Sequence, residues 1–199
     1  MYYVFKADDK ASWAEVQGEM PNFLELGKKW HWWSDAPLPI SFPETTFRIL
    51  DDILLDRYKT GSIFDLYSKR LIKLLHNSDV RCEYFQVNVV ASNKQKRIYL
   101  QYYAFHLMET LAAIDYEKSE LIDSQIFGKF DHKDIIRMEL IEKLIKTQRP
   151  LVRDAERPSL LLMHQSLKDM LTAEGIIGCK YIPYQNYRDM SISDIFIHE

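Results

Sequence analysis

A pattern that occurs twice constrains the fold of this chain more than any other feature of its sequence. The first copy covers residues 65–85 and the second covers residues 161–182. In each copy an apolar segment leads into a short run with leucines at helical spacing, and a second apolar segment follows. The corresponding positions are Leu71 and Leu167, Leu75 and Leu171, Cys82 and Cys179, and Tyr84 and Tyr181. Each copy therefore predicts a strand, a short helix and a second strand.

The ends of these predicted helices carry the residues that helices favour. Ser68 is suited to the N-cap of the first helix, because a serine oxygen accepts the free backbone N–H groups there. Gly175 follows the second helix, where glycine tolerates the left-handed backbone conformation. In each copy about fifteen residues separate the two strands, which is long enough for a crossover between parallel strands. Whether the two strands pair directly stays open.

We therefore expect an α+β fold with a mixed sheet and short helices, built from two similar strand-helix-strand units in one compact domain. The domain spans residues 1–199, with lobes at 1–60, 61–120 and 121–199 as a subdivision. A chain of this length can bury a sizeable core. A region with Leu50, Ile53, Leu54 and Tyr58 at helical spacing predicts one more helix before the first repeat.

Composition and charge bound the partners and the compartment. The formal net charge is −3, so we expect no nucleic-acid partner. The first residues lack a basic stretch followed by a long apolar run, so we expect no signal peptide, and no apolar run approaches the ~20 residues that span a bilayer. The two cysteines are expected to be reduced, buried thiols. Together these observations favour a cytoplasmic protein without a membrane partner.

The sequence contains no recognised catalytic or cofactor motif. The glycine-rich phosphate loops, C-x-x-C, H-E-x-x-H and G-x-S-x-G are all absent. Three weaker groupings each have a chemical and a structural interpretation. Asp131, His132 and Asp134 are either a hard-metal site or a polar turn, and Asp115, Glu117 and Glu120 are either an acid–base set or a capped turn. Cys82 or Cys179 is either a thiol nucleophile or a buried thiol. We expect the structural alternatives, and hence no catalytic residue, metal or cofactor.

Two groups of residues are candidates for binding a protein partner. Trp30, Trp32 and Trp33 form an unusual cluster, and tryptophan is favoured both in cores and as an interface anchor. An acidic group lies on the polar faces of the helix predicted before the first repeat, where it either steers a basic partner or is simply solvated. Its members are Asp51, Asp52 and Asp56.

From about residue 47 to residue 188 the chain resembles the type-eleven immunity proteins of bacterial polymorphic-toxin systems. The resemblance lies in four segments taken in order along the chain. They are residues 65–75 (DLYSKRLIKLL), Tyr102-Tyr103 with residues 113–119 (AIDYEKS), residues 150–153 (PLVR) with 164–167 (HQSL), and residues 175–183 (GIIGCKYIP). The opening Met1-Tyr2-Tyr3 and the tryptophan-rich stretch are compatible with it.

The resemblance implies a protein that is not an enzyme and that binds a cognate toxin domain, delivered by a contact-dependent system such as type VI secretion. It identifies no toxin-contacting residue and no toxin activity, so nuclease, NAD-consuming, lipase and pore-forming toxins all stay open. The alternatives are an adaptor that binds another protein and, less favoured, an enzyme using the groupings named above. Oligomeric state is open, as is the question of whether the repeat is a true duplication.

Overall fold

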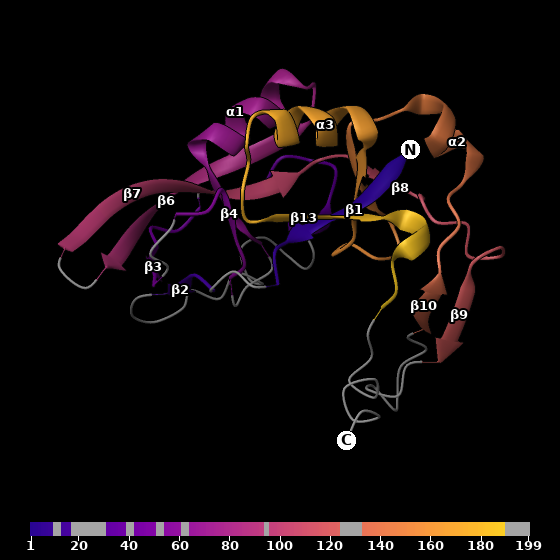
Figure 1. The fold of residues 1–199 in the computed structure, drawn as a ribbon, viewed down its shortest axis with the longest axis horizontal. Helices are drawn as coiled ribbons and strands as arrows, with labels where there is room; N and C mark the ends of the chain where they lie inside the picture. Colours follow the sequence, from indigo (N-terminus) through magenta and orange to yellow (C-terminus); the bar gives the residue numbers. More distant parts are fainter. Residues whose placement is uncertain are drawn as a thin grey trace.

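The computed structural model describes residues 1–9, 13–16, 31–38, 42–50, 54–60, 64–93, 96–123 and 133–189. Figure 1 shows two sheets with helices along one side and a projecting two-stranded hairpin. The five-stranded sheet has the order β13 (Cys179–Pro183), β1 (Tyr2–Ala7), β12 (Leu161–His164), β11 (Leu151–Asp154), β8 (Thr110–Leu111). The six-stranded sheet has the order β2 (Glu15–Val16), β3 (Thr46–Ile49), β6 (Cys82–Asn93), β7 (Lys96–Leu107), β5 (Leu66–Ser68), β4 (Arg57–Tyr58).

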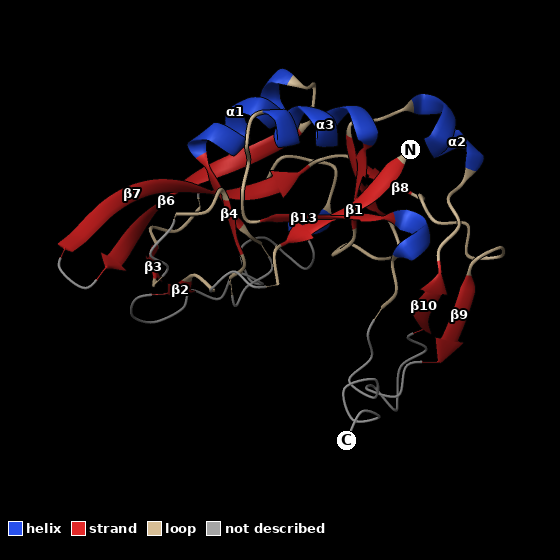
Figure 2. Cartoon of the chain, in the orientation of Figure 1, coloured by secondary structure: helices blue, strands red, loops and turns tan. Residues whose placement is uncertain are grey.

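The remaining elements are short. The hairpin pairs β9 (Glu120–Asp123) with β10 (Lys133–Arg137). The helices are α1 (Lys69–Asn77), α2 (Glu142–Thr147) and α3 (Gln165–Ala173), and the 3-10 turns are η1 (His31–Trp33) and η2 (Tyr184–Asn186). Both larger sheets combine antiparallel pairs with one parallel pair, β3 with β6 and β11 with β8. Figure 2 shows how small the helical share is, and the predicted α+β class is confirmed.

The two predicted strand-helix-strand units are confirmed as β5–α1–β6 and β12–α3–β13. The two strands of a unit do not pair with each other. In the first unit β7 lies between β5 and β6 and is antiparallel to both. In the second unit β1 lies between β12 and β13 in the same way. The outer strands of each unit are therefore parallel to each other, with one antiparallel strand inserted.

The register of the inserted strands matches between the units. Tyr84 lies opposite Phe105, and Tyr181 lies opposite Phe5. The cysteines match in the same way: Cys82 and Cys179 each lie opposite the residue that is two positions after the phenylalanine in the inserted strand. The inserted strands share a sequence pattern, with Tyr2-Tyr3-Val4-Phe5 in β1 and Tyr102-Tyr103-Ala104-Phe105 in β7. The two units are structurally equivalent, and each includes a third strand that lies outside the repeat seen in the sequence.

The helix ends follow the predicted chemistry. The Ser68 hydroxyl accepts the backbone N–H of Leu71 at 3.1 Å. In the second unit His164 takes the same place, and its Nδ1 accepts the backbone N–H of Ser166 at 3.3 Å. Gly175 has φ +65°, the left-handed conformation expected after a helix. None of the helices among the described residues is long and apolar enough to cross a membrane.

The two units share one hydrophobic core. Helices α1 and α3 lie side by side on the same side of the sheets (Figure 1). Their repeat leucines at positions 71, 75, 167 and 171 are all at most 2% exposed and belong to a single cluster. Phe5 and Met163 of one sheet and Phe105 of the other also belong to this cluster. Burial of these apolar side chains, not pairing between the sheets, holds the units together.

The helix predicted around residues 50–58 is wrong where the structure describes it. Leu54 and Leu55 are in a loop, and Arg57 and Tyr58 form β4, which pairs with β5. Positions 51–53 lie outside the described residues. Tyr58 is fully buried and its hydroxyl accepts the backbone N–H of Leu55 at 2.9 Å. The helical spacing was misleading because these positions do not share a buried face: Tyr58 is fully buried, whereas Leu50 and Leu54 are exposed.

Candidate functional site

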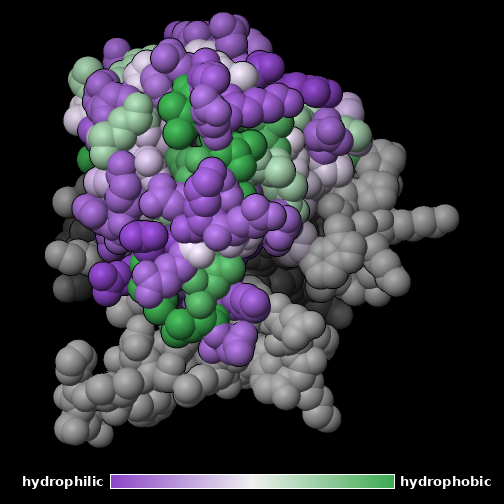
Figure 3. All heavy atoms as spheres, turned by 90° about the vertical axis from the view of Figure 1, so that its right-hand side faces the viewer, coloured by the Kyte–Doolittle hydropathy of each residue, from purple (hydrophilic) through white to green (hydrophobic). Residues whose placement is uncertain are grey.

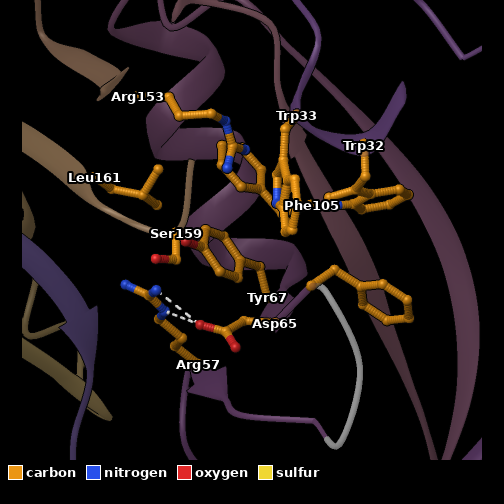
Figure 4. A pocket seen from close by; sticks show the side chains of 10 residues that line it. Trp32, Trp33, Arg57, Asp65, Tyr67, Phe105, Arg153, Ser159 and Leu161 are labelled. Atoms are coloured by element: carbon orange, nitrogen blue, oxygen red, sulfur yellow. Dashed lines mark hydrogen bonds and ion pairs between the residues drawn. The ribbon is translucent and has the colours of Figure 1, made fainter. Parts of the chain in front are cut away.

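A pocket of about 340 Å³ lies between the two larger sheets. The strands β4, β5 and β7 line one side, β11 and β12 line the other, and η1 adds to the wall. Figure 4 shows the lining side chains. They are Trp32, Trp33, Arg57, Phe64, Asp65, Tyr67, Phe105, Arg153, Ser159 and Leu161. Because its walls come from both repeat units, the pocket forms only when the two units pack together.

Trp32 and Trp33 reach this pocket from η1. Trp32 is 5% exposed and packs its ring against those of Phe64 and Phe85, with centroids 5.0 and 5.9 Å apart. Trp33 is half-buried at the same wall. The sequence left each tryptophan of the cluster as either a core residue or a partner anchor, and the structure makes Trp32 a core residue of the six-stranded sheet. Trp33 keeps the accessibility that an anchor needs.

A buried histidine holds the loop that follows η1. His106 is fully buried, and its Nε2 lies 3.2 Å from the carbonyl oxygen of Ser34. Its Nδ1 lies 3.2 Å from Glu83, whose carboxylate also accepts the backbone N–H of Leu38 at 2.9 Å. Burial lowers the pKa of His106, although the bond to Glu83 opposes the change. These contacts fix residues 34–38 against β6 and β7.

Arg57 is the first of two buried arginines in the pocket. It is 5% exposed, and its Nε and one terminal nitrogen contact Asp65 at 2.8 and 2.7 Å. Its guanidinium lies over Phe5, 4.3 Å from the ring centroid. The other terminal nitrogen, Nη1, is buried and has no hydrogen-bond partner among the described residues. Asp65 thus balances the charge of Arg57 without using all of its donors.

Arg153 is the second, and it lacks an equivalent carboxylate in the pocket lining. It is 5% exposed, and one terminal nitrogen donates to the carbonyl oxygen of Pro158. Its Nε is buried without a hydrogen-bond partner among the residues that the structure describes. Burial lowers the pKa of Arg153 to about 10, with Tyr67 offsetting part of the effect. The guanidinium is therefore still charged near neutral pH.

Asp56 does not belong to a solvated acidic face, which corrects the expectation for this residue. It is 6% exposed and accepts hydrogen bonds from Ser68 at 2.6 Å, Arg70 at 2.6 Å and the backbone N–H of Ile177 at 3.0 Å. Burial would raise the pKa of Asp56, but these hydrogen bonds outweigh it and the pKa is lowered. Asp56 joins the first unit to the second. The other predicted contacts, Trp30, Asp51 and Asp52, lie outside the described residues.

The weaker chemical groupings have structural roles where they are described. Asp115 closes a turn by accepting the backbone N–H of Lys118 at 3.2 Å, the capped turn that was expected. Cys82 and Cys179 are free thiols that pack against the shared core, and burial raises their pKa values to about 11 and about 12. Both are half-buried, so they are less enclosed than expected. Within the described ranges no group of three or more His, Cys, Asp or Glu side chains could hold a metal, and Asp131 and His132 fall outside them.

Sequence reasoning missed the two arginines of the pocket. Arg153 lies in the PLVR segment that carries the family resemblance, so the sequence marks its position but not its role. Arg57 was assigned to a helix that does not form, and nothing in the surrounding sequence marks it as buried. Their proximity results from packing one unit on the other, across almost a hundred positions of chain.

Comparison with known proteins agrees with the architecture. Residues 51–186, more than half of the chain, match the profile of the Immunity protein family (Imm11). The match starts just before β4 and ends at η2, so it includes both repeat units except β1. No curated protein matches the sequence. The coverage shows that this chain belongs to the Immunity protein family (Imm11).

Proposed function

We propose that this protein binds a cognate antibacterial toxin in the cytoplasm and neutralises it by occluding the toxin, without catalysing a reaction itself. The observation that carries this proposal is membership of an immunity protein family over residues 51–186. The free, protonated thiols at Cys82 and Cys179 suit a reducing compartment. Polymorphic-toxin systems and type VI secretion are the proposed source and route of the toxin.

The rim of the pocket is the surface we propose for toxin binding. Trp33 is half-buried there, and the adjoining residues 35–37 are exposed. An aromatic side chain beside polar, accessible backbone is typical of an interface anchor. Because His106 and Glu83 already hold the loop, binding would cost little additional ordering of the backbone. Trp30, Asp51 and Asp52 remain predicted contacts, whereas Trp32 is buried behind this surface and Asp56 is buried where it links the two units.

A second surface provides a matched alternative. Figure 3 shows the end of the molecule that carries α2 and the β9–β10 hairpin, where apolar areas lie among hydrophilic ones. Ile145 of α2 is 48% exposed and Ile122 of β9 is 47% exposed. Exposed apolar area of this kind is a general feature of interaction sites. This end face is the alternative location for the interface. Truncating either isoleucine therefore serves as the control for Trp33, because it removes apolar contact area away from the pocket.

The test is a survival assay with a binding measurement. The toxin-like domain encoded beside this gene is expressed in a susceptible bacterium with and without the protein, and the pair is tested for co-elution. Rescue with a stable complex supports toxin neutralisation. A complex with some native partner, and no rescue from the toxin, would favour an adaptor instead.

Two variants then locate the interface. We expect Trp33→Ala to weaken toxin binding by at least tenfold, since interface tryptophans commonly contribute about 2 kcal/mol or more. Ile145→Ala should leave affinity unchanged. The reverse result would move the interface to the end face, and circular dichroism of both variants shows that the fold is retained.

A further inference from the structure

The pocket carries one buried positive charge more than its own residues balance. Among its ten lining residues there are two arginines, Arg57 and Arg153, and one acidic residue, Asp65. Asp65 contacts Arg57, and no carboxylate among the described residues forms an ion pair with Arg153. An unpaired buried charge is strongly destabilising, and buried charges in proteins normally have a counter-ion. The lining therefore suits a ligand that supplies a single negative charge.

The two guanidinium groups of the pocket also carry unpaired donors. Arg57 and Arg153 each have one buried N–H-bearing nitrogen without a partner among the described residues. Figure 4 shows Ser159 and the ring of Tyr67 between the two guanidinium groups. Both nitrogens are closed to solvent, so an oxyanion in the pocket would interact with the guanidinium groups through charge rather than through these two atoms. Guanidinium groups bind carboxylates and phosphates with strong, charge-assisted hydrogen bonds.

The size and walls of the pocket exclude a bare ion as its full occupant. A water molecule occupies about 30 Å³ of liquid volume, so an inorganic ion would leave most of the pocket unfilled. A volume of about 340 Å³ is in the range of small-molecule sites. Trp33 contributes a flat aromatic surface to its wall, and behind the wall Phe105 is stacked on Tyr67 with ring centroids 4.4 Å apart. The Trp33 surface favours a planar ring as the body of the ligand.

We propose that the pocket between the two sheets binds a small aromatic carboxylate, with Arg153 balancing the carboxylate charge and Trp33 in the pocket wall packing on the ring. A carboxylate matches the single unbalanced charge. A phosphate monoester carries about −1.5 to −2 at pH 7 and would overcompensate it. Trp33 belongs both to this site and to the rim proposed for toxin binding, but the two proposals are tested separately because the ligand test uses the isolated protein and no toxin.

The first experiment compares charged and neutral ligands of the same shape on the unmodified protein. Indole-3-acetate is the carboxylate probe, indole-3-acetamide is its neutral match, and adenosine monophosphate tests a phosphate ester. Thermal unfolding and isothermal calorimetry are the readouts. At about ten times its dissociation constant, indole-3-acetate should raise Tm by roughly 3–6 °C. The amide should have no comparable effect, and the nucleotide should bind more weakly than the acid.

Variants identify the residue responsible. Arg153→Gln should weaken indole-3-acetate binding by about tenfold or more, the loss expected for a charge-assisted hydrogen bond. Arg149→Gln is the matched control, because Arg149 is on the same segment but its side chain is 55% exposed and contacts Glu109. It should bind as the unmodified protein does. Equal binding of acid and amide, stronger binding of the nucleotide, or unchanged acid binding by folded Arg153→Gln would each overturn the proposal. If Arg153→Gln does not fold, the comparison of the three ligands on the unmodified protein still supports or overturns it.

Discussion

Replacing Gly178 by alanine should destabilise the protein by about 2–4 kcal/mol. Gly178 has φ +80°, a conformation that costs an alanine about 1 kcal/mol. A Cβ there would lie 2.8 Å from the carbonyl oxygen of Arg57 and 2.8 Å from the Cβ of Leu55. Relieving such overpacking costs roughly 1–3 kcal/mol in addition. The neighbouring backbone would have to move because Gly178, just before β13, lies directly against the backbone of Arg57 in β4.

Gly175 provides the matched control. It has φ +65°, so alanine there has the same backbone cost of about 1 kcal/mol. No atom lies within 4 Å of its Cβ position, so the steric term is absent. The effect of alanine on the unfolded chain is the same for both and cancels in the difference. Gly178→Ala should therefore be about 1–3 kcal/mol less stable than Gly175→Ala.

Urea unfolding followed by tryptophan fluorescence measures this difference, with the slope m checked for constancy between variants. Agreement of the two variants within about 0.5 kcal/mol would refute the reasoning. It would mean that the contact between Gly178 and β4 relaxes at negligible cost. A change in m instead would show that the variant alters the compactness of a state, and the comparison would then use hydrogen exchange.

Asp56→Ala should lower the free energy of unfolding by about 2–4 kcal/mol, because it leaves the backbone N–H of Ile177 without its acceptor and removes the ion pair with Arg70. Urea unfolding checks this, and a loss below about 0.5 kcal/mol would contradict it. Because the pKa of His106 is lowered in the folded protein, the unfolded chain binds a proton at this histidine more readily than the folded protein does. The stability that comes from keeping His106 neutral is therefore complete above the unfolded-state pKa of about 6.5 and is lost as pH falls below it. His106→Gln should flatten the dependence of unfolding free energy on pH in that window, and an unchanged slope would exclude His106 as its source. Cys82 and Cys179 should react slowly with iodoacetamide at pH 8 in the folded protein and rapidly in urea, because their pKa values are raised to about 11 and about 12. Mass spectrometry measures the modification, and fast modification of the folded protein would count against burial of the thiols.

The local sequence predicted one part of the candidate site correctly and another part wrongly. The tryptophan-rich segment was identified by composition, and two of its members do line the pocket. The acidic spacing around Asp56 was interpreted as a helix face, yet the side chain is buried because its hydrogen-bond donors come from two distant segments. A carboxylate that is satisfied by distant donors has the same local sequence as one that is solvated. The sequence contains no signal that separates these cases.

The two strand-helix-strand units follow from the sequence alone, since leucine spacing, the serine cap at position 68 and Gly175 are local features that act within one or two turns of chain. The family is also evident in the sequence, through segments spread along the repeats. The insertion of β7 and β1 into the units is visible only in the folded chain, because strand pairing depends on hydrogen bonds between segments far apart in the chain. Folding likewise brings Arg57 and Arg153 to one pocket, since burial of a charged side chain is a property of the packed units and not of its neighbours in sequence.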